Sequence, residues 1–437
     1  MKLKKIALAT ILGAGTLMSA SYAQTEIQWW HSMNGALNDW VNDLAKEFNE
    51  SQSDYKVVPV FKGDYEQSMT AGIAAIRSGN APDILQVFEV GTASMIYSKG
   101  VTKSVSDIMK ENKIPFDINT YIPAVAGYYA SPEGDLLSLP FNSSTTVMYY
   151  NKDEFKKAGL DPDKAPKTWK ELREATEALK AAGSKCPMTI SWMGWTQLES
   201  FSAWHNVPFA TKNNGFGGMD VELQFNSPLH VKHFENLSDM AKNGLFVYKG
   251  RSVASQPAFL SGECAIFMGS SGFYSGLKRD AKFDFAETTL PYYDDVEGAP
   301  QNTVIGGASL WVLNGKPAEN YKGVAKFFEF ISEPQRAANS HMRTGYLPIT
   351  KEAFEITEKS GYYNENPGAD VPVQQMIRDT TDNTRGLRLG NMLQIRTIVD
   401  EETEQVWTGQ KTPKDALDSA VERGNALLKR FERVNNK

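Results

Sequence analysis

The sequence predicts an α/β protein built as two lobes, with a helical region at its C-terminal end. Three observations indicate this architecture. The chain has 437 residues, which is too long for one ordinary hydrophobic core. Its composition, 41% hydrophobic and 11% aromatic, is typical of an ordered globular protein. Two separate stretches alternate between strand patterns and helix patterns, and the last third of the chain is mostly helical in pattern.

The first α/β unit contains three short apolar runs, which predict buried strands at residues 26–30, 56–61 and 84–88. Between these runs, apolar residues recur at helical spacing, namely Leu37, Val41, Leu44 and Phe48, and then Met69, Ile73 and Ile76. The resulting β-α-β-α-β order predicts a parallel sheet with right-handed crossovers.

The second α/β unit restarts this pattern, with strands expected at residues 145–150 and 188–192. Thr168 and Glu171 have the spacing of a capping box, which predicts the start of a helix, and Pro228 is placed to open another. Further helices are expected near residues 321–331, 391–407 and 413–430.

Residues 1–23 have the order of zones found in a secretory signal peptide. Three lysines precede an apolar stretch at residues 6–18 that is too short to span a bilayer. Ser21 and Ala23 are small residues at the positions that a signal peptidase reads, so we expect cleavage before Gln24. The alternative is an apolar core helix, but the order of the zones favours export to a bacterial periplasm.

The chain has a formal net charge of −6, although the expected leader holds three lysines and no acid. The expected mature chain is therefore more acidic still, which argues against nucleic acid or an anionic membrane as the main partner. A small anionic ligand remains compatible, because a few donors in a cleft outweigh a diffuse field at short range. The two cysteines, Cys186 and Cys264, could form a disulfide in an oxidising compartment.

Polar and aromatic residues follow the predicted strands at the ends where open α/β sheets bind ligands. Ser32 follows the first strand, Tyr65 follows the second, and Glu89 follows the third. Trp192 and Trp195 follow a strand of the second unit. Each of the aromatic residues could be an ordinary core or rim residue, but their recurrence at strand ends favours a ligand cleft.

Two turns could present backbone N–H groups to an anion, namely Ser-Ser-Gly at residues 270–272 and Gly-Gly at residues 306–307. This signal is weak by itself, because such turns are common and neither matches a nucleotide-binding fingerprint. Arg396 lies among apolar residues of a predicted helix, where an arginine is usually a solvated surface residue.

The sequence contains no complete catalytic or metal-binding motif, since G-x-S-x-G and H-E-x-x-H are both absent. His230 and His233 share a helix face but have no evident third ligand, so we interpret this face as solvated. Glu89 could be one acid of a glycosidase, but no partner acid can be assigned. We expect no metal and no cofactor.

Eight short segments of the chain resemble one family. They lie at residues 30–32, 63–67, 85–93, 140–144, 306–311, 344–350, 386–392 and 406–409. The run Thr-Gly-Tyr-Leu-Pro at residues 344–348 is shared by many extracellular solute-binding proteins, whereas Asn-Ser-Ser at residues 142–144 and the run at residues 386–392 are more particular. Over essentially the whole expected mature chain, the sequence is similar to the periplasmic sn-glycerol-3-phosphate-binding proteins of ABC importers.

This resemblance implies a two-lobe periplasmic-binding-protein fold, type II and maltose-binding-like, with multiple crossover strands. Lobe I is expected to comprise residues 24–143 and 264–310, and lobe II residues 144–263 and 311–437. Crossovers are expected near residues 140–144, 262–268 and 307–313. Cys264 would then lie on a crossover, where a bond to Cys186 would restrain hinge motion, so we expect two free, buried thiols.

The resemblance also implies the ligand contacts, which fall on Tyr65, Glu89, Ser144, Trp192, Ser270, Gly307, Tyr346 and Arg396. Trp192 would form an aromatic wall, and Glu89 would accept hydrogen bonds from the glycerol hydroxyls. The phosphate would receive hydrogen bonds from Ser270, the Gly307 N–H, Tyr346 and Arg396. The assignment of Arg396 depends on the anchor at Gly386, because residues 378–385 form a segment one residue shorter than the family leads us to expect.

The implied function is capture of sn-glycerol 3-phosphate, and also of glycerophosphodiesters such as glycerophosphocholine, whose choline would lie near Trp192 or Trp195. The expected partners are this small ligand and the permease subunits of an inner-membrane ABC importer with its cytoplasmic ATPase. We expect a monomer that is not an enzyme and binds no nucleic acid. Two alternatives remain: an oligosaccharide-binding protein of the same fold, and a periplasmic hydrolase of phosphodiesters.

Overall fold

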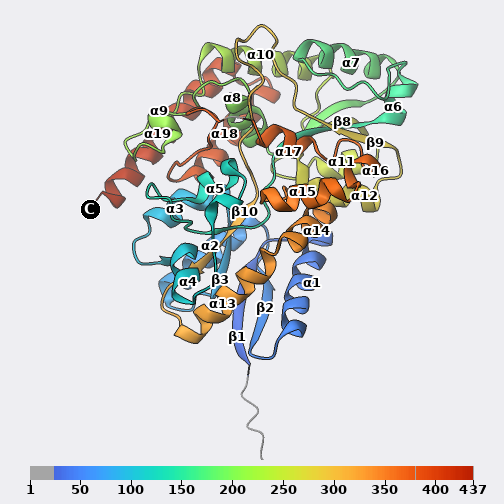
Figure 1. The fold of residues 1–437 in the computed structure, drawn as a ribbon. Coiled ribbons are helices and arrows are strands. Elements are labelled where there is room, and N and C mark those ends of the chain that lie inside the picture. Colours follow the sequence, from blue (N-terminus) through green and yellow to red (C-terminus); the bar gives the residue numbers. More distant parts are fainter. Residues whose placement is uncertain (1–23, 379, 437) are drawn as a thin grey trace, which may run out of the picture.

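The fold contains two β-sheets, one in each of two lobes (Figure 1). The structure is a computed structural model that describes residues 24–378 and 380–436. The expected signal peptide, residues 1–23, lies outside the described residues. Within the described ranges, no helix combines the length and the apolar character needed to cross a membrane.

The sheet of the first lobe has the strand order β2-β1-β3-β10-β4, with β5 paired to β10. β1, β2 and β3 are parallel, as the sequence predicts, and β10 runs antiparallel to β3. The three predicted strands are confirmed to within one residue at each end. The bounds are β1 Thr25–His31, β2 Tyr55–Phe61, β3 Ile84–Phe88, β4 Thr102–Lys103, β5 Leu139–Pro140 and β10 Ala308–Leu313.

Apolar side chains cover both faces of this first sheet. Trp29 of β1 packs against Phe141 and against Phe327 of α13, with ring centroids 5.2 and 5.4 Å apart. On β3, Leu85 and Val87 belong to a second core cluster that also includes residues of α18 and α19. The helices of this part are α1 Gly35–Ser51, α2 Tyr65–Ser78, η1 Glu89–Gly91, α3 Thr92–Tyr97, α4 Val105–Glu111, η2 Ile118–Thr120, α5 Pro123–Tyr129, α13 Ala318–Ile331, α14 Pro334–Thr344 and α15 Lys351–Lys359.

The sheet of the second lobe has the order β7-β8-β6-β9. Its strands are β6 Thr146–Asn151, β7 Cys186–Ile190, β8 Cys264–Ser270 and β9 Phe285–Thr288. The capping box at Thr168 is confirmed, since its side chain accepts from the Glu171 N–H at the start of α7. The helices here are α6 Lys152–Lys157, α7 Trp169–Ala181, the π-helix η3 Trp195–Glu199, α8 Ser200–Trp204, α9 Thr211–Asn214, α10 Pro228–Lys242, α11 Gln256–Leu260, η4 Ser271–Phe273, α12 Tyr274–Asp280, α16 Tyr362–Glu365 and α17 Val371–Met376.

Two long helices close the chain, α18 Met392–Trp407 and α19 Pro413–Asn435. Figure 1 shows them beside α8, α9 and α10 of the second lobe, in agreement with the contacts of α10 with both helices. The predicted helix at residues 391–407 is confirmed, while α19 continues five residues past the predicted end at residue 430.

The expected division into lobes must be corrected in two places. Residues 264–310 were expected in lobe I, but β8 hydrogen-bonds to β6 on one side and to β7 on the other. The crossover expected at residues 262–268 therefore lies inside the second sheet, and the chain returns to the first sheet between β9 and β10. Residues 311–437 were expected in lobe II, but α13 packs on β1 of the first lobe through Phe327.

The expectation of two free thiols is wrong, because Cys186 and Cys264 form a disulfide. The two residues are in register on the parallel strands β7 and β8, and their Cα atoms are 4.5 Å apart. The expectation failed because it placed Cys264 on an interlobe crossover. The bond joins neighbouring strands of one sheet and does not cross between the lobes.

The interpretation of His230 and His233 as a solvated helix face is also wrong, since both side chains are completely buried. His230 hydrogen-bonds to the hydroxyls of Ser202 and Ser227 through its two ring nitrogens. His233 stacks on Phe201, with ring centroids 4.0 Å apart. This face of α10 packs into the core of the second lobe.

Candidate functional site

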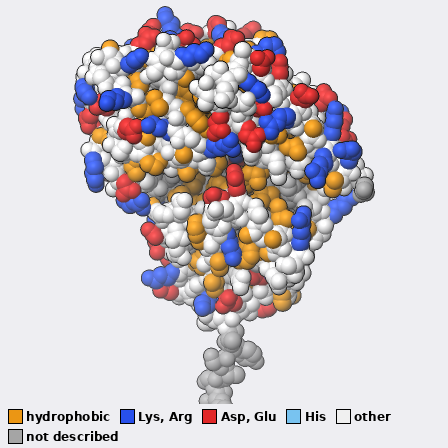
Figure 2. All heavy atoms as spheres, turned by 180° about the vertical axis from the view of Figure 1, so that it is seen from behind, with side chains coloured by type: hydrophobic (Ala, Val, Ile, Leu, Met, Phe, Trp, Pro, Cys, Tyr) orange, Lys and Arg blue, Asp and Glu red, His pale blue; other side chains and the backbone are white. Residues whose placement is uncertain are grey.

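A pocket of about 380 Å³ lies between the two lobes. The space-filling view shows a recess across the middle of one face of the molecule, with apolar side chains exposed inside it (Figure 2). All the residues implied by the family resemblance line this one pocket, namely Tyr65, Glu89, Ser144, Trp192, Ser270, Gly307, Tyr346 and Arg396. They come from segments that are far apart in the sequence, so the fold itself brings them together.

Tyr65 is held in place by a chain of hydrogen bonds that runs through the first lobe. The Ser32 N–H donates to Gln86 Oε1 at 2.7 Å, and Gln86 Nε2 donates to Asn142 Oδ1 at 2.8 Å. Asn142 Nδ2 then donates to the Tyr65 hydroxyl oxygen at 2.8 Å. Because this oxygen already accepts a bond, its own hydrogen can be donated to the neighbouring Tyr346 hydroxyl or to a ligand. Burial raises the pKa of Tyr65 well above its ordinary value, so it stays a neutral donor.

The two segments that cross between the sheets pair with each other at the pocket wall, through an antiparallel bridge between Ser144 and Gly306. Gly307 follows with φ +81°, and a Cβ at this position would lie 1.9 Å from the Asn142 carbonyl oxygen. Only glycine fits such a position. The crossing segments therefore bring the Ser144 hydroxyl and the backbone of Gly307 to the same pocket.

Ser270 and Tyr346 supply two further hydroxyl groups. Ser270 Oγ accepts a hydrogen bond from the Gly272 N–H at 3.1 Å, which leaves its own hydrogen free to donate. Tyr346 lies against Gly272, where an added Cβ would be 2.5 Å from the ring. Burial raises the pKa of Tyr346 to about 12, so its hydroxyl also stays protonated.

Arg396 is not the solvated surface residue that its helix pattern alone suggests, since its side chain is 12% exposed. Its Nη2 lies 2.6 Å from Glu89 Oε1 and 2.7 Å from Glu199 Oε2, and its Nε lies 2.7 Å from Glu199 Oε1. Among the described residues, no acceptor takes a hydrogen bond from Nη1, which is therefore available to a ligand. The structure thus places Glu89 and Arg396 in contact, although they were expected to hold opposite ends of the ligand.

Burial and charge act in opposite directions on this cluster. Burial raises the pKa of Glu89, the positive charge of Arg396 counteracts this effect, and the negative charge of Glu199 adds to it. Burial alone would lower the pKa of Arg396, but the two glutamates hold it above its ordinary value. Arg396 therefore remains charged.

Sequence reasoning missed Glu199, which is 3% exposed and lies at the end of the π-helix η3. Glu199 and Arg396 are 197 positions apart, and no local motif links them. The sequence pattern did indicate Trp195, which begins the same π-helix and whose ring lies against Gly306. A π-helix widens one turn and often occurs at a functional site, but the sequence pattern does not reveal it.

Trp192 lies two residues beyond the end of β7, and not at the strand end predicted for residues 188–192. Its φ is +52°, and its N–H donates to the Ser252 carbonyl at 3.0 Å. This turn directs Trp192 toward the pocket, where it packs beside Trp195. The outer pocket residues Gln256, Arg279 and Asp280 were not anticipated from the sequence.

The model of the family described as bacterial extracellular solute-binding protein matches residues 43–369. The chain belongs to this family. It is 57% identical, over 94% of each chain, to the sn-glycerol-3-phosphate-binding periplasmic protein UgpB of Yersinia enterocolitica. It is 56% identical to the protein of the same name from Salmonella typhimurium, again over 94% of each chain. The resemblance to this group noted in the sequence is confirmed.

Solved structures of other solute-binding proteins share the fold. UgpB from Mycobacterium tuberculosis in complex with glycerophosphocholine has a TM-score of 0.79 at 22% identity, over 93% of this chain and 99% of that one. Maltose-bound MalE3 of T. maritima has a TM-score of 0.74 at 16% identity, over 93% and 100%. The predicted two-lobe, maltose-binding-like fold is therefore confirmed.

The described residues contain no group of three or more His, Cys, Asp or Glu side chains arranged to hold a metal ion. The pocket instead offers hydroxyl groups, backbone glycines, two tryptophans and the Glu89–Arg396 pair. These groups can donate to an anion and exchange hydrogen bonds with hydroxyl groups. The arrangement is suited to binding a small polar ligand.

Proposed function

We propose that this chain is a periplasmic receptor that captures sn-glycerol 3-phosphate between its lobes and delivers it to an ABC importer, with permease subunits in the inner membrane and a cytoplasmic ATPase. The observation that carries this proposal is the convergence of all the implied contact residues on one interlobe pocket. The names of the relatives at 55–57% identity support it. The receptor would bind the ligand and release it chemically unchanged.

The phosphate would lie against the hydroxyl-rich part of the pocket. Ser144, Ser270 and Tyr346 can each donate one hydrogen bond, and Gly307 can add a backbone N–H. Hydrogen bonds to an anion are shorter and stronger than neutral ones, so several such donors can compensate for the lost hydration of a phosphate. This set omits Arg396 from the phosphate end, because that guanidinium is already bonded to two carboxylates.

The glycerol hydroxyls would lie at the Glu89–Arg396 pair. Glu89 uses Oε1 for the arginine, so Oε2 can accept from a ligand hydroxyl, and Arg396 Nη1 can donate to one. A neighbouring acceptor and donor suit a group that carries adjacent hydroxyls. The negative charge of Glu89 would repel a phosphate here, which also favours this orientation.

Glycerophosphodiesters such as glycerophosphocholine would bind in the same orientation. The donors at the phosphate end are uncharged, so they do not require a doubly charged phosphomonoester. The second ester group would extend toward the outer part of the pocket, and a choline could contact the face of Trp192 or Trp195. The same tryptophans favour one alternative, an oligosaccharide receptor of this fold, because aromatic rings pack well on sugar faces.

A thermal-shift and calorimetry screen tests this function with four compounds: sn-glycerol 3-phosphate, glycerophosphocholine, maltose and inorganic phosphate. We expect binding of the first two, weak binding of inorganic phosphate and none of maltose. A response to maltose alone would instead support the oligosaccharide receptor. Recovery of intact glycerophosphocholine after prolonged incubation would support binding without catalysis, whereas release of choline would indicate a hydrolase.

A further inference from the structure

Glu199 is close to the pocket but acts on it through Arg396. Its two carboxylate oxygens bond to Nε and Nη2 of Arg396, each at 2.7 Å, in a bidentate arrangement. The side chain is 3% exposed, and it is not among the residues that line the interlobe pocket. Glu199 therefore acts on a ligand without touching it, by fixing the position of the arginine and by adding a negative charge behind it.

The resulting cluster contains two carboxylates and one guanidinium, so its formal charges sum to one negative charge. Arg396 Nη2 also lies 2.6 Å from Glu89 Oε1, and Glu89 is 5% exposed. Among the other charged residues that line the pocket, Arg279 is paired with Asp280, while Asp64 caps α2. No cation in the described pocket lining offsets the extra negative charge near Glu89.

Side-chain contacts fix the helical turn that carries Glu199. The π-helix η3 spans Trp195–Glu199, with Trp195 on the pocket wall at one end and Glu199 at the other. In its middle, Gln197 Oε1 hydrogen-bonds to His233 Nε2 at 2.9 Å, and Gln197 Nε2 contacts the sulfur of Met268. Side chains from α10 and β8 therefore fix the wide turn that presents Glu199 to Arg396.

We propose that Glu199 is a positioning residue that orients Arg396 and makes the Glu89–Arg396 end of the pocket negative, so that this end accepts an uncharged polyol and rejects a second anionic group. This inference rests on the proposed function. It specifies the ligand class as a phosphate or phosphodiester with a neutral hydroxyl-bearing head. A ligand with an anion at each end is excluded because its second anion meets two carboxylates that share a single cation.

Calorimetry with two matched probes tests this inference. The probes are sn-glycerol 3-phosphate and racemic 3-phosphoglycerate, in which a carboxylate replaces the free hydroxymethyl group. We expect the wild-type chain to prefer sn-glycerol 3-phosphate strongly. In Glu199→Gln this preference should fall by about tenfold or more, because one buried negative charge near the second anion is removed. A purely structural defect would instead weaken both ligands equally.

Two further variants serve as controls. Glu199→Asp keeps the charge and should keep most of the preference for sn-glycerol 3-phosphate. Glu401→Gln removes one negative charge from the same helix as Arg396, but Glu401 bonds to Arg423 away from the pocket, so the preference should not change. An equal change in Glu401→Gln would attribute the effect to overall charge and overturn the inference.

The outcomes separate this inference from the proposed function. If the wild-type chain does not bind sn-glycerol 3-phosphate, both fail. If it binds that ligand and Glu199→Gln keeps the full preference over 3-phosphoglycerate, the inference fails and the function stands. If Glu199→Gln does not fold, Glu89→Gln decides, because it removes the other carboxylate and must lower the same preference ratio.

Discussion

Tyr346 contributes a hydroxyl to the pocket while its ring forms part of the core of the first lobe. The ring lies near Trp40, with centroids 6.2 Å apart, and the residue is 7% exposed. The Tyr346 hydroxyl lies 3.8 Å from the sulfur of Met33 and also interacts with the side chains of Tyr65 and Asn142 at the pocket. Removal of this oxygen therefore changes the pocket far more than it changes the packing.

We predict that Tyr346→Phe weakens binding of sn-glycerol 3-phosphate by about tenfold or more, since a hydrogen bond to a charged group contributes about 1.5–3 kcal/mol. The melting temperature without ligand should stay close to that of the wild type. Calorimetry and thermal unfolding measure the two effects. Tyr121→Phe is the matched control, because its buried hydroxyl lies 3.5 Å from Ser332 and does not line the pocket. Equal affinities of the wild type, Tyr346→Phe and Tyr121→Phe would show that the Tyr346 hydroxyl does not bind the ligand.

Arg396 has a structural role in addition to its place in the pocket, because it is the cation between Glu89 and Glu199. Removal of one partner from a buried ion pair typically costs about 3–5 kcal/mol. We predict a loss of that order in the free energy of unfolding for Arg396→Ala at pH 7.5, together with loss of ligand binding. Urea unfolding measures the first quantity.

The stability deficit of Arg396→Ala should depend on pH. Burial and the negative charge of Glu199 raise the pKa of Glu89, and without the cation nothing counteracts them in the folded variant. Stability contributed by a raised pKa increases as pH falls, so the deficit should shrink between pH 7.5 and pH 5. Arg251→Ala is the control, because Arg251 pairs with Glu404 at a more exposed site and should cost less than about 1 kcal/mol. A deficit that grows toward pH 5 would contradict this account.

At the scale of elements, local signals in the sequence predicted the strands and capped helices well. The capping box at Thr168 and the buried run of β3 each depend on residues close together in the chain. The disulfide forms because β7 pairs with β8, and no local sequence pattern predicts that pairing. The partnership of Glu199 with Arg396 likewise requires a π-helix and a contact across 197 positions.

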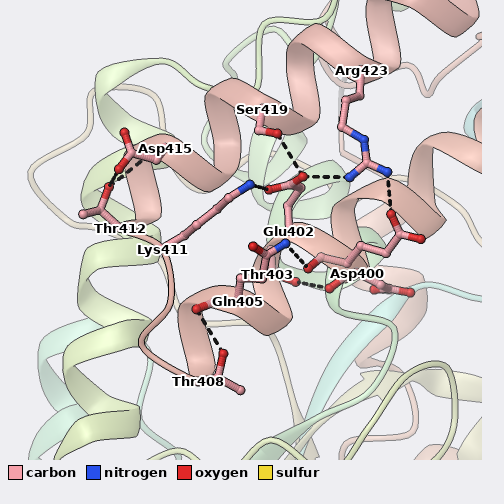
Figure 3. Close-up of polar contacts among 11 residues, drawn as sticks. Asp400, Glu402, Thr403, Gln405, Thr408, Lys411, Thr412, Asp415, Ser419 and Arg423 are labelled. Carbon is pink, nitrogen blue, oxygen red and sulfur yellow. Dashed lines mark hydrogen bonds and ion pairs between the residues drawn. The ribbon is translucent and has the colours of Figure 1, made fainter.

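The α18–α19 pair positions Arg396 and is joined by a network around Glu402 (Figure 3). Glu402 is 2% exposed and accepts hydrogen bonds from Lys411 at 2.5 Å, Arg423 at 2.7 Å and Ser419 at 2.9 Å. Burial opposes its ionisation, but these three donors hold the pKa of Glu402 below its ordinary value. The carboxylate thus ties α19 and the preceding turn to α18.

We predict that Glu402→Gln lowers the free energy of unfolding by about 2 kcal/mol at pH 7, less than a fully buried pair because Lys411 and Arg423 are partly exposed. A lowered pKa contributes stability that is present at neutral pH and lost as pH falls below about 4.5. The two proteins should therefore converge in stability at pH 3–4. Glu401→Gln, which breaks an exposed pair, should cost below about 1 kcal/mol. Urea titrations at both pH values give the comparison.

At the scale of the whole molecule, the sequence predicted that the site lies between two lobes, because strand ends and family motifs converge there. It assigned some segments to the wrong lobe, because the chain crosses between the sheets in places that composition does not mark. β8 lies wholly in the second sheet, and α13 packs on β1 of the first. Those assignments depend on which strands pair, and pairing between distant segments has no local signature.

All five histidines of the sequence are buried, and they are distributed over both lobes. Burial lowers the pKa of His31, His205 and His341 to about 4 and that of His230 to about 3. Burial also lowers the pKa of His233 well below its ordinary value. Each histidine is therefore neutral in the folded protein at pH values where it gains a proton in the unfolded chain.

We predict that stability falls as pH is lowered from 7 to 5. A histidine whose pKa is lowered in the folded state contributes stability that is fully present above about pH 6.5. This stability is lost as pH falls toward the folded-state pKa, by up to about 1.4 kcal/mol per pH unit for each histidine. Three carboxyls oppose this trend, since desolvation raises the pKa of the half-buried Asp400 to about 6 and raises the pKa values of the buried Glu89 and Glu287. The five histidines outweigh the three carboxyls, so lowering the pH reduces the free energy of unfolding.

Urea unfolding at pH 7.0, 6.0 and 5.0 measures this slope directly. His230→Gln should make the slope of unfolding free energy against pH shallower by about the contribution of one histidine. This holds whatever the effect of the substitution on stability at pH 7, because it removes one of the groups that take up a proton on unfolding. Glutamine keeps both a donor and an acceptor for Ser202 and Ser227. A stability that rises steadily from pH 7 to pH 5 would mean that the carboxyls dominate and would contradict the assignment of neutral, buried histidines.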